Sequence, residues 1–258
     1  MKKLQLILLT SVLAVTSYAF VAFAAPKTAG LLPDLQTVVP QHLGIVNEHQ
    51  REILRFSNGI ANTGDGDWRI RPEFPLADTT QPQRAIQEIL DASGNLVDQK
   101  VVSEFEFHEQ HNHWHINGIA LFEVRAGSVT GPIVGNNSIK TTFCLIDWYK
   151  LEDNSPTKER KYFECNGALQ GISPGWVDQY HQSVDGQQLD ITGVPVGIYY
   201  LVSRANPDQV FIEQDLNNNT AWVAFKLTRD SNGNPKVKVI GHSPCQTVGL
   251  CGENAPNR

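Results

Sequence analysis

The chain has 258 residues, of which 21 are lysine or arginine and 27 are aspartate or glutamate, so its formal net charge is −6. This acidic balance disfavours nucleic acid as a partner, because binding to phosphates requires a basic surface. The hydrophobic content of 41% can supply a sizeable core, and the length is typical of one or two domains.

The first 24 residues have the features of a secretory signal peptide. A basic start is followed by the apolar run Leu4–Ala25, and small residues flank Phe23 just before Pro26. A retained membrane anchor is the alternative interpretation. No other apolar run is long enough to span a membrane. We therefore expect a secreted or periplasmic protein, without membrane contact after cleavage, whose residues 25–258 form one domain.

The first clear pair of strands is predicted around an Asp-Ala-Ser-Gly-Asn turn at residues 91–95. Ala85–Leu90 and Leu96–Val102 flank this turn, as expected for a β-hairpin. A helix is the alternative for the first segment, because its isoleucines and final leucine also fit a helical stripe.

Three alternating histidines follow this hairpin. His111, His113 and His115 would present all three imidazoles on one face of a strand. On a flat strand the outer two Cα atoms lie about 13 Å apart, whereas three nitrogens must approach one metal ion to about 2 Å. The metal hypothesis therefore requires the segment to bend. The alternative is a solvated polar face.

The metal itself is left open by these residues. Imidazole suits both copper and zinc, and three histidines alone do not decide between them. His108 is a further candidate, either as a fourth ligand, as a neighbour that orients a ligand, or as a plain surface residue.

The remainder of the chain predicts more strands and no long amphipathic helix. Turn-forming residues are concentrated at 135–137 and 232–233. The pattern predicts an all-β fold, specifically a β-sandwich with long loops. The strand-like runs are Ile119–Val124, Ile198–Val202, Ala221–Thr228 and Lys236–Ile240.

Four cysteines in an exported chain indicate disulfide bonds. Three pairings are possible, and we favour Cys144 with Cys165 and Cys245 with Cys251, the second of which closes a small loop.

Oxygen donors are dense near residue 215. Glu213, Asp215, Asn218 and Asn219 offer the carboxylate and amide oxygens that calcium prefers. An asparagine-rich turn held by local side-chain hydrogen bonds is the alternative.

The order of motifs resembles that of the lysyl oxidase catalytic domain from about Pro33 to Thr228. The histidine motif is followed by Lys-Thr-Thr-Phe-Cys-Leu, Gln-Gly-Ile-Ser-Pro-Gly, Asp-Gln-Tyr, Asp-Gly-Gln-Gln-Leu-Asp-Ile-Thr and Glu-Gln-Asp-Leu-Asn-Asn-Asn. These segments occupy residues 140–145, 170–175, 178–180, 185–192 and 213–219.

The resemblance implies a copper amine oxidase of the protein-lysine 6-oxidase kind. Copper would be bound by the three histidines, and Lys140 and Tyr180 would form the cofactor lysyl tyrosylquinone. Such an enzyme uses oxygen to convert primary amines, on protein lysines or small molecules, to aldehydes with release of ammonia and hydrogen peroxide. Asp185 is the expected general base, with Asp178 and His181 as alternatives.

The resemblance also adds Asp34 and the carbonyl of Leu35 to the predicted calcium ligands. Three departures from the family pattern stand out. Gln110 and Gly186 replace family cysteines, and a family histidine aligns best with Leu121. Two other functions remain open, a zinc hydrolase with a free water position and an exported metal-binding sandwich without catalysis.

Overall fold

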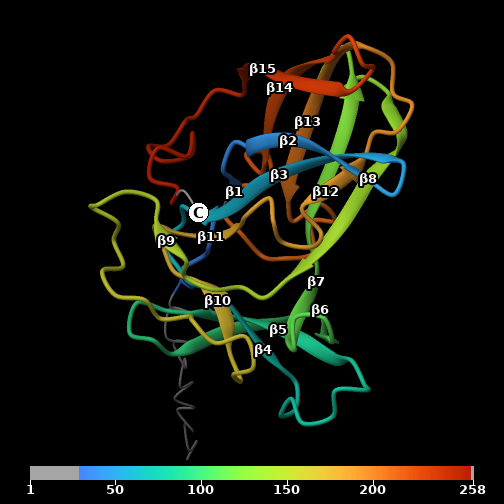
Figure 1. Cartoon of the computed structure of the whole chain (residues 1–258). Coiled ribbons are helices and arrows are strands. Elements are labelled where there is room, and N and C mark those ends of the chain that lie inside the picture. Colours follow the sequence, from blue (N-terminus) through green and yellow to red (C-terminus); the bar gives the residue numbers. More distant parts are fainter. Residues whose placement is uncertain (1–28, 257–258) are drawn as a thin grey trace, which may run out of the picture.

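The computed structural model describes residues 29–256, apart from the side chains of residues 135–138 and 140 (Figure 1). The described residues form fifteen β-strands in two antiparallel sheets and no helix, so the all-β prediction is confirmed. The predicted signal peptide, residues 1–24, lies outside the described residues, and the single-domain expectation stays a prediction.

The smaller sheet is built around one long strand, β3. Its main path runs β1–β3–β11–β9, and β2 and β12 also pair with β3. The strands are β1 (Leu35–Thr37), β2 (Gln41–Glu48), β3 (Arg51–Asn62), β9 (Tyr149–Lys150), β11 (Trp176–Tyr180) and β12 (Gln188–Asp190).

The larger sheet runs β10–β4–β5–β6–β7–β13–β14–β15, and β8 also pairs with β7. Its central strand β7 pairs with β6 over residues 113–116 and with β13 over residues 120–126, so it links two halves of the sheet (Figure 1). The strands are β4 (Trp68–Pro72), β5 (Gln83–Leu90), β6 (Leu96–His108), β7 (His113–Ala126), β8 (Ile133–Phe143), β10 (Gln170–Ile172), β13 (Gly197–Ala205), β14 (Thr220–Arg229) and β15 (Pro235–His242).

The hairpin predicted around residues 91–95 is confirmed, and its helical alternative is wrong. β5 and β6 pair in antiparallel register from Gln83 opposite Phe105 to Leu90 opposite Leu96. Gly94 has a φ of 82°, a conformation that glycine adopts at little cost. All four strand-like runs predicted farther along the chain also lie within strands β7, β13, β14 and β15.

The turn predicted at residues 135–137 is wrong, because this segment lies within β8. Pairing with β7 explains the difference. Glu123 lies opposite Ser138 and Arg125 opposite Ile133, so β7 advances by two positions while β8 advances by five. The extra residues of the glycine-asparagine segment are accommodated by an irregularity within the strand.

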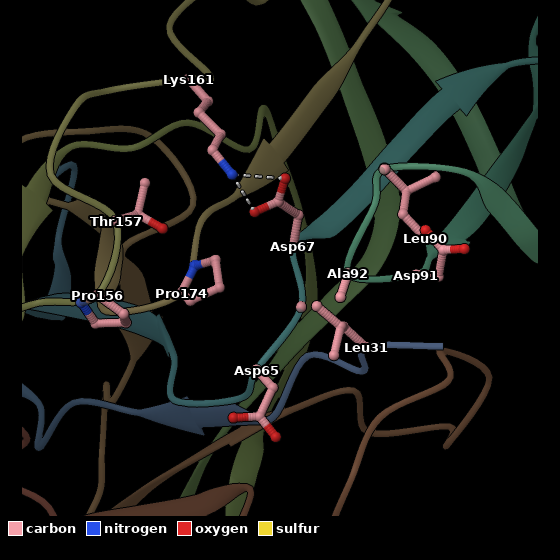
Figure 2. Close-up of a pocket in the computed structure, with 12 residues that line it drawn as sticks. Leu31, Asp65, Asp67, Leu90, Asp91, Ala92, Pro156, Thr157, Lys161 and Pro174 are labelled. Atoms are coloured by element: carbon pink, nitrogen blue, oxygen red, sulfur yellow. Dashed lines mark hydrogen bonds and ion pairs between the residues drawn. The ribbon is translucent and has the colours of Figure 1, made fainter. Parts of the chain in front are cut away.

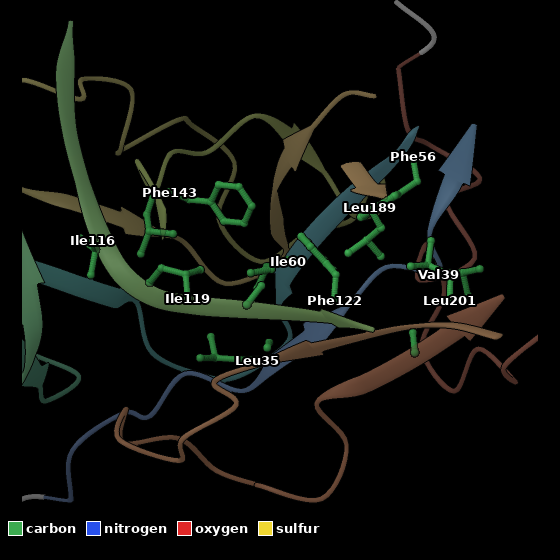
Figure 3. Packing of buried hydrophobic residues seen from close by; sticks show 14 of the residues in the cluster. Leu35, Val39, Phe56, Ile60, Ile116, Ile119, Phe122, Phe143, Leu189 and Leu201 are labelled. Carbon is green, nitrogen blue, oxygen red and sulfur yellow. The ribbon is translucent and has the colours of Figure 1, made fainter. Parts of the chain in front are cut away.

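The core lies between the two sheets (Figure 3). Phe56 of β3 and Phe122 of β7 are both fully buried, and their rings meet edge to face with centroids 4.9 Å apart. Complete burial of side chains of this size contributes about 1.5–3 kcal/mol each. This packing fixes β7 against β3 and so places the segments at the start of β7 and the end of β11.

Both favoured disulfide pairings, Cys144 with Cys165 and Cys245 with Cys251, are confirmed. The part of the chain that the structure describes contains no helix with the length and apolarity needed to cross a membrane.

Candidate functional site

A tight turn between β6 and β7 gathers the histidines. β6 ends at His108 and β7 begins opposite it at His113. The backbone N–H groups of His111 and Asn112 both donate to the carbonyl of His108, at 3.1 and 2.8 Å. Asn112 has a φ of 55°, which asparagine tolerates better than most residues. The bend required by the metal hypothesis is therefore present in the backbone.

The imidazole nitrogens of this turn converge. His115 Nε2 lies 3.0 Å from His113 Nε2 and 3.2 Å from His111 Nδ1. Two nitrogens bound at about 2.0 Å to one ion at tetrahedral angles would lie about 3.3 Å apart. These two spacings match those of ligands around a single copper or zinc ion, and the group whose ligand atoms all lie within 4.8 Å of one another is His108, His111 and His115.

His108 belongs to the same cluster. Its ring stacks on that of His115, with centroids 4.7 Å apart and an interplanar angle of 17°. His108, His111 and His115 can each offer a ligand nitrogen within 4.8 Å of the others. We call these four residues, His108, His111, His113 and His115, the histidine centre.

His111, His113 and His115 favour neutral imidazole, the form that binds metal. Burial, followed by the neighbouring imidazoles, lowers the pKa of His115 to about 3. Burial also lowers the pKa of His113 and His111, and the carboxylate of Asp185 opposes this effect at His111. His115 Nδ1 lies 3.0 Å from the hydroxyl oxygen of Thr142 in β8, which fixes the orientation of the ring and leaves Nε2 for a metal.

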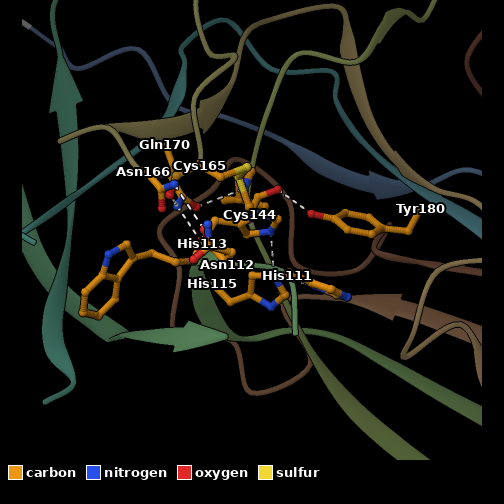
Figure 4. The surroundings of a disulfide bond; sticks show 11 residues. His111, Asn112, His113, His115, Cys144, Cys165, Asn166, Gln170 and Tyr180 are labelled. Atoms are coloured by element: carbon orange, nitrogen blue, oxygen red, sulfur yellow. Dashed lines mark hydrogen bonds between the residues drawn. A yellow bond between two sulfur atoms is a disulfide. The ribbon is translucent and has the colours of Figure 1, made fainter. Parts of the chain in front are cut away.

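Tyr180, at the end of β11, is held beside the centre. Its hydroxyl donates to the carbonyl of Cys144 at 2.5 Å, and its ring stacks on that of Phe143 with centroids 3.9 Å apart. Figure 4 shows the Tyr180 ring to one side of the Cys144–Cys165 disulfide, with His111 and His113 below that bond in the view. Burial, together with the nearby Asp178, raises the pKa of the phenol well above its usual range.

One pocket of about 290 Å³ is lined both by histidines of the centre and by the tyrosine. The residues concerned are His111, His113 and Tyr180. The remaining lining residues are Ile146, Trp148, Cys165, Asp178, Gln179 and Val184. A second hollow of about 460 Å³ reaches His108 and His115 from the side of the acidic Glu106 and Glu109.

The three candidate bases occupy different positions. Asp178 is 2% exposed and lines the pocket; burial and the neighbouring Asp147 raise its pKa well above the usual range. Asp185 is exposed and follows Val184 of the pocket wall directly. His181 follows Tyr180 directly, and its Nδ1 lies 3.0 Å from the hydroxyl of Ser183.

Lys140 can be placed by its backbone alone. It lies in β8 opposite Leu121 of β7 and two positions before Thr142. The position that aligns with a family histidine is therefore the direct strand partner of Lys140. Position 140 is therefore on β8, the strand that pairs directly with β7, and β7 carries His113 and His115 at its start.

The predicted calcium residues form a second polar cluster, which we call the carboxylate–amide junction (Asp34, Glu213, Asn218 and Asn219). Asn218 Nδ2 donates to both carboxylate oxygens of Asp34 at 3.0 Å, and Asn219 Nδ2 donates to Glu213 Oε1 at 2.8 Å. The backbone N–H of Leu35 donates to Glu213 Oε2 at 2.9 Å. The junction thus ties β1 to the loop before β14.

Several features of the junction suit a cation. The side-chain oxygens of Asn218 and Asn219 are buried and have no hydrogen-bond partner among the described residues. Burial raises the pKa of Glu213, and the charge of Asp34 adds to this. Asp215 is exposed and instead accepts hydrogen bonds from the backbone and side-chain nitrogens of Asn217.

Another pocket, of about 300 Å³, is lined by Asp65, Asp67 and Asp91 (Figure 2). Each carboxylate there already has a partner. Asp67 accepts from Lys161 Nζ at 2.9 Å, Asp65 accepts from Gln214, and Asp91 accepts from the backbone of its own turn. This pocket offers no free group for catalysis.

Sequence reasoning did not identify two residues of the site. Thr142 stands two positions after Lys140 in the Lys-Thr-Thr-Phe-Cys-Leu motif, so its place in that motif could have marked it as a residue of the site. Trp148, in the pocket wall, follows no periodic pattern and could be located only by the fold.

Comparisons with known proteins agree with the geometry. A family model described as Lysyl oxidase matches residues 87–234. The chain is 32% identical to lysyl oxidase homolog 1 of Bos taurus over 137 residues, which is 53% of this chain and 22% of that protein. It is 30% identical to protein-lysine 6-oxidase of Sus scrofa over 126 residues, 48% of this chain and 47% of that protein.

A third relative gives the longest of these alignments. Lysyl oxidase homolog 3 of Homo sapiens is 31% identical over 171 residues, 66% of this chain and 18% of that protein. The matched region thus spans less than half the length of each of these relatives. Because the family model covers more than half of the chain, the protein belongs to the lysyl oxidase family.

Proposed function

We propose that the protein is a copper-dependent amine oxidase whose quinone cofactor is made from Lys140 and Tyr180. The observation that carries the proposal is the single pocket lined by His111, His113 and Tyr180. A metal at the histidines and a quinone at the tyrosine ring would both face this space. Family membership supports the same assignment.

The donor set fits copper. His111, His113 and His115 would hold the ion, because His115 Nε2 lies 3.0–3.2 Å from a nitrogen of each of the other two and burial lowers the pKa of all three. His108 is close enough to complete the site or to exclude water from it. Thr142 would maintain the orientation of His115.

The quinone would supply the electron sink for oxidising the amine, and the chain supplies orientation and proton transfer. The carbonyl of Cys144 and the ring of Phe143 fix the plane of the Tyr180 ring. Asp185, beside the pocket wall, is our candidate to take the proton from the carbon next to the amine nitrogen. This carboxylate is close enough to His111 for its charge to affect that imidazole.

The overall reaction consumes a primary amine, oxygen and water. The carbon next to nitrogen loses two electrons and becomes an aldehyde with its oxygen drawn from water. Nitrogen leaves as ammonia, and oxygen is reduced to hydrogen peroxide. Either a protein lysine or a small amine satisfies this chemistry.

The proposal is tested by measuring hydrogen peroxide release from n-butylamine after copper loading in air. The wild type should be active, and Tyr180→Phe should lose at least about a thousandfold of kcat/KM, because it removes the precursor of the cofactor. Tyr200→Phe, a half-buried tyrosine on β13, is the matched control and should remain active. Retained activity in Tyr180→Phe would refute the cofactor assignment, and neither a zinc hydrolase nor a metal-binding sandwich would release peroxide at all.

For the carboxylate–amide junction we propose a structural calcium ion. Asp34, Glu213, Asn218, Asn219 and the carbonyl of Leu35 are the proposed ligands. The orphaned amide oxygens and two buried carboxylates support this assignment. Asp215 accepts both of its hydrogen bonds from Asn217 on Oδ1, so it could join them through Oδ2.

We further propose that the protein works in an oxidising compartment, either secreted or periplasmic. Two disulfide bonds support this location, as does the signal-like sequence of residues 1–24.

A further inference from the structure

The pocket beside Tyr180 has a distinct chemical character. Its walls include the apolar side chains of Ile146, Trp148 and Val184 together with the tyrosine ring. Among its lining residues, Asp178 is the single carboxylate. The volume of about 290 Å³ lies at the lower end of the range for ligand pockets, so it suits a side chain or a small amine.

Asp178 is unusual because half of its carboxylate has no partner. The backbone N–H of Ile146 donates to this carboxylate. Oδ2, however, is buried and accepts no hydrogen bond from any described residue. A buried polar atom without a partner is rare and calls for a group that supplies one.

The neighbouring Asp147 provides the contrast. Its side chain is also fully buried, but Oδ1 accepts from the backbone of Ser173 at 2.7 Å. Oδ2 accepts from the backbone of Lys161 and Tyr162 and from the hydroxyl of Ser173. Asp147 is therefore fully satisfied within the fold, whereas Asp178, which lines the pocket, keeps one buried oxygen without a partner among the described residues.

We propose that this pocket is the amine subsite and that it selects monoamines with an apolar chain. Asp178 Oδ2 receives the ammonium group, and Ile146, Trp148 and Val184 contact the chain. The inference rests on the proposed oxidase function and adds the class of substrate. A diamine is disfavoured because its second charge would lie against the apolar side chains of the wall, and the nearest other carboxylate in sequence, the exposed Asp185, is outside the lining of the pocket.

The electrostatics are consistent with a cationic ligand. Burial and the charge of Asp147 raise the pKa of Asp178, and the more distant Arg160 opposes them only in part. An ammonium ion bound in the pocket would place a positive charge beside Asp178 and so stabilise its ionised form.

Binding can be measured without turnover. Calorimetric titration of the full chain prepared without copper, in which no quinone forms, compares n-butylammonium with 1,4-diaminobutane. We expect n-butylammonium to bind at least about tenfold more tightly. Asp178→Asn should weaken its binding at least tenfold, whereas Asp153→Asn, at an exposed loop aspartate, should leave it unchanged.

A second variant tests the wall and does not depend on the folding of Asp178→Asn. Val184→Asp adds a carboxylate to the pocket wall and should improve binding of 1,4-diaminobutane about tenfold relative to n-butylammonium. Equal binding of the two amines by the wild type, or an unchanged preference in Val184→Asp, would overturn the inference.

The two proposals can fail independently. If the protein releases peroxide but does not prefer n-butylammonium, the proposed subsite is refuted and the proposed oxidase function is retained. If it prefers n-butylammonium but releases no peroxide, the amine pocket is supported and the oxidase function is refuted.

Discussion

The histidine centre and the carboxylate–amide junction are two polar clusters built in opposite ways. The histidine centre comes from one tight turn within a span of eight residues, consists of imidazole nitrogens and borders a pocket. The junction joins residues as far apart as Asp34 and Asn218, which are 184 positions apart, and consists of buried carboxylate and amide oxygens.

The difference indicates a division of roles. The geometry of the histidine centre is set within one hairpin, so we expect loss or exchange of its metal to leave the rest of the fold in place. A cluster that connects the start of the first strand to the loop between β13 and β14 should contribute to the stability of the whole domain. Changes at the histidine centre should therefore affect chemistry more than stability, and changes at the junction should do the reverse.

The largest expected effect is at His115. We expect His115→Ala to weaken copper binding by more than about a hundredfold, because this imidazole lies within 3.2 Å of two other ligand nitrogens. Competition with a chelator of known affinity measures the change. His242→Ala, an exposed histidine on β15, is the control. Equal copper affinity in the two variants would contradict the location of the centre.

The next effect concerns calcium. In copper-free protein, calcium at about one hundred times its Kd should stabilise the fold by about 2.7 kcal/mol, a shift in Tm of about 5–10 °C for a chain of this size. Scanning calorimetry with calcium or with EGTA measures it. Glu213→Gln should greatly reduce the shift, whereas Asp215→Asn should retain most of it. A Tm that is insensitive to calcium would argue for a junction held by hydrogen bonds alone.

Thr142 gives a smaller effect at the histidine centre. Thr142→Val removes the hydroxyl that lies 3.0 Å from His115 Nδ1 and should weaken copper binding about tenfold. Thr142→Ser keeps the hydroxyl and should bind nearly as well as the wild type. If serine and valine behave alike, the hydroxyl does not orient His115.

The smallest effect is a dependence of stability on pH. The pKa of Asp178 is raised by burial, so the folded state holds a proton that the unfolded state has released. This contribution to stability is present below pH 4 and is lost as the pH rises through the folded pKa. Asp178→Asn should therefore gain stability relative to the copper-free wild type as the pH rises from 4 to 8. Urea unfolding at pH 4 and pH 8 tests this, and a difference independent of pH would refute it.

The sequence predicted features that depend on local pattern. The alternating histidines required a bend, and the turn at residues 109–112 supplies it. The hairpin around residues 91–95 also followed from local signals, and the disulfide pairings that we favoured among three possible sets are present. By contrast, the glycine-asparagine segment at 135–137 was misread as a turn, because pairing with β7 draws it into β8.

Features set by tertiary packing could not be predicted. The contrast between Asp147, which accepts from the backbone of Lys161, Tyr162 and Ser173, and Asp178, whose Oδ2 is buried without a partner, is visible only in the fold. The contribution of Trp148 to the pocket wall depends on the path of the connection between β8 and β9. The motif order identified Tyr180, but its position beside the histidines depends on the packing of the two sheets.

The most direct measurement is mass spectrometry of a proteolytic digest after copper loading in air. The account predicts one covalently joined species that contains Lys140 and Tyr180 together with added oxygen, and its absence when oxygen is excluded. Separate, unmodified peptides carrying residues 140 and 180 from fully copper-loaded protein that has been exposed to air would contradict it.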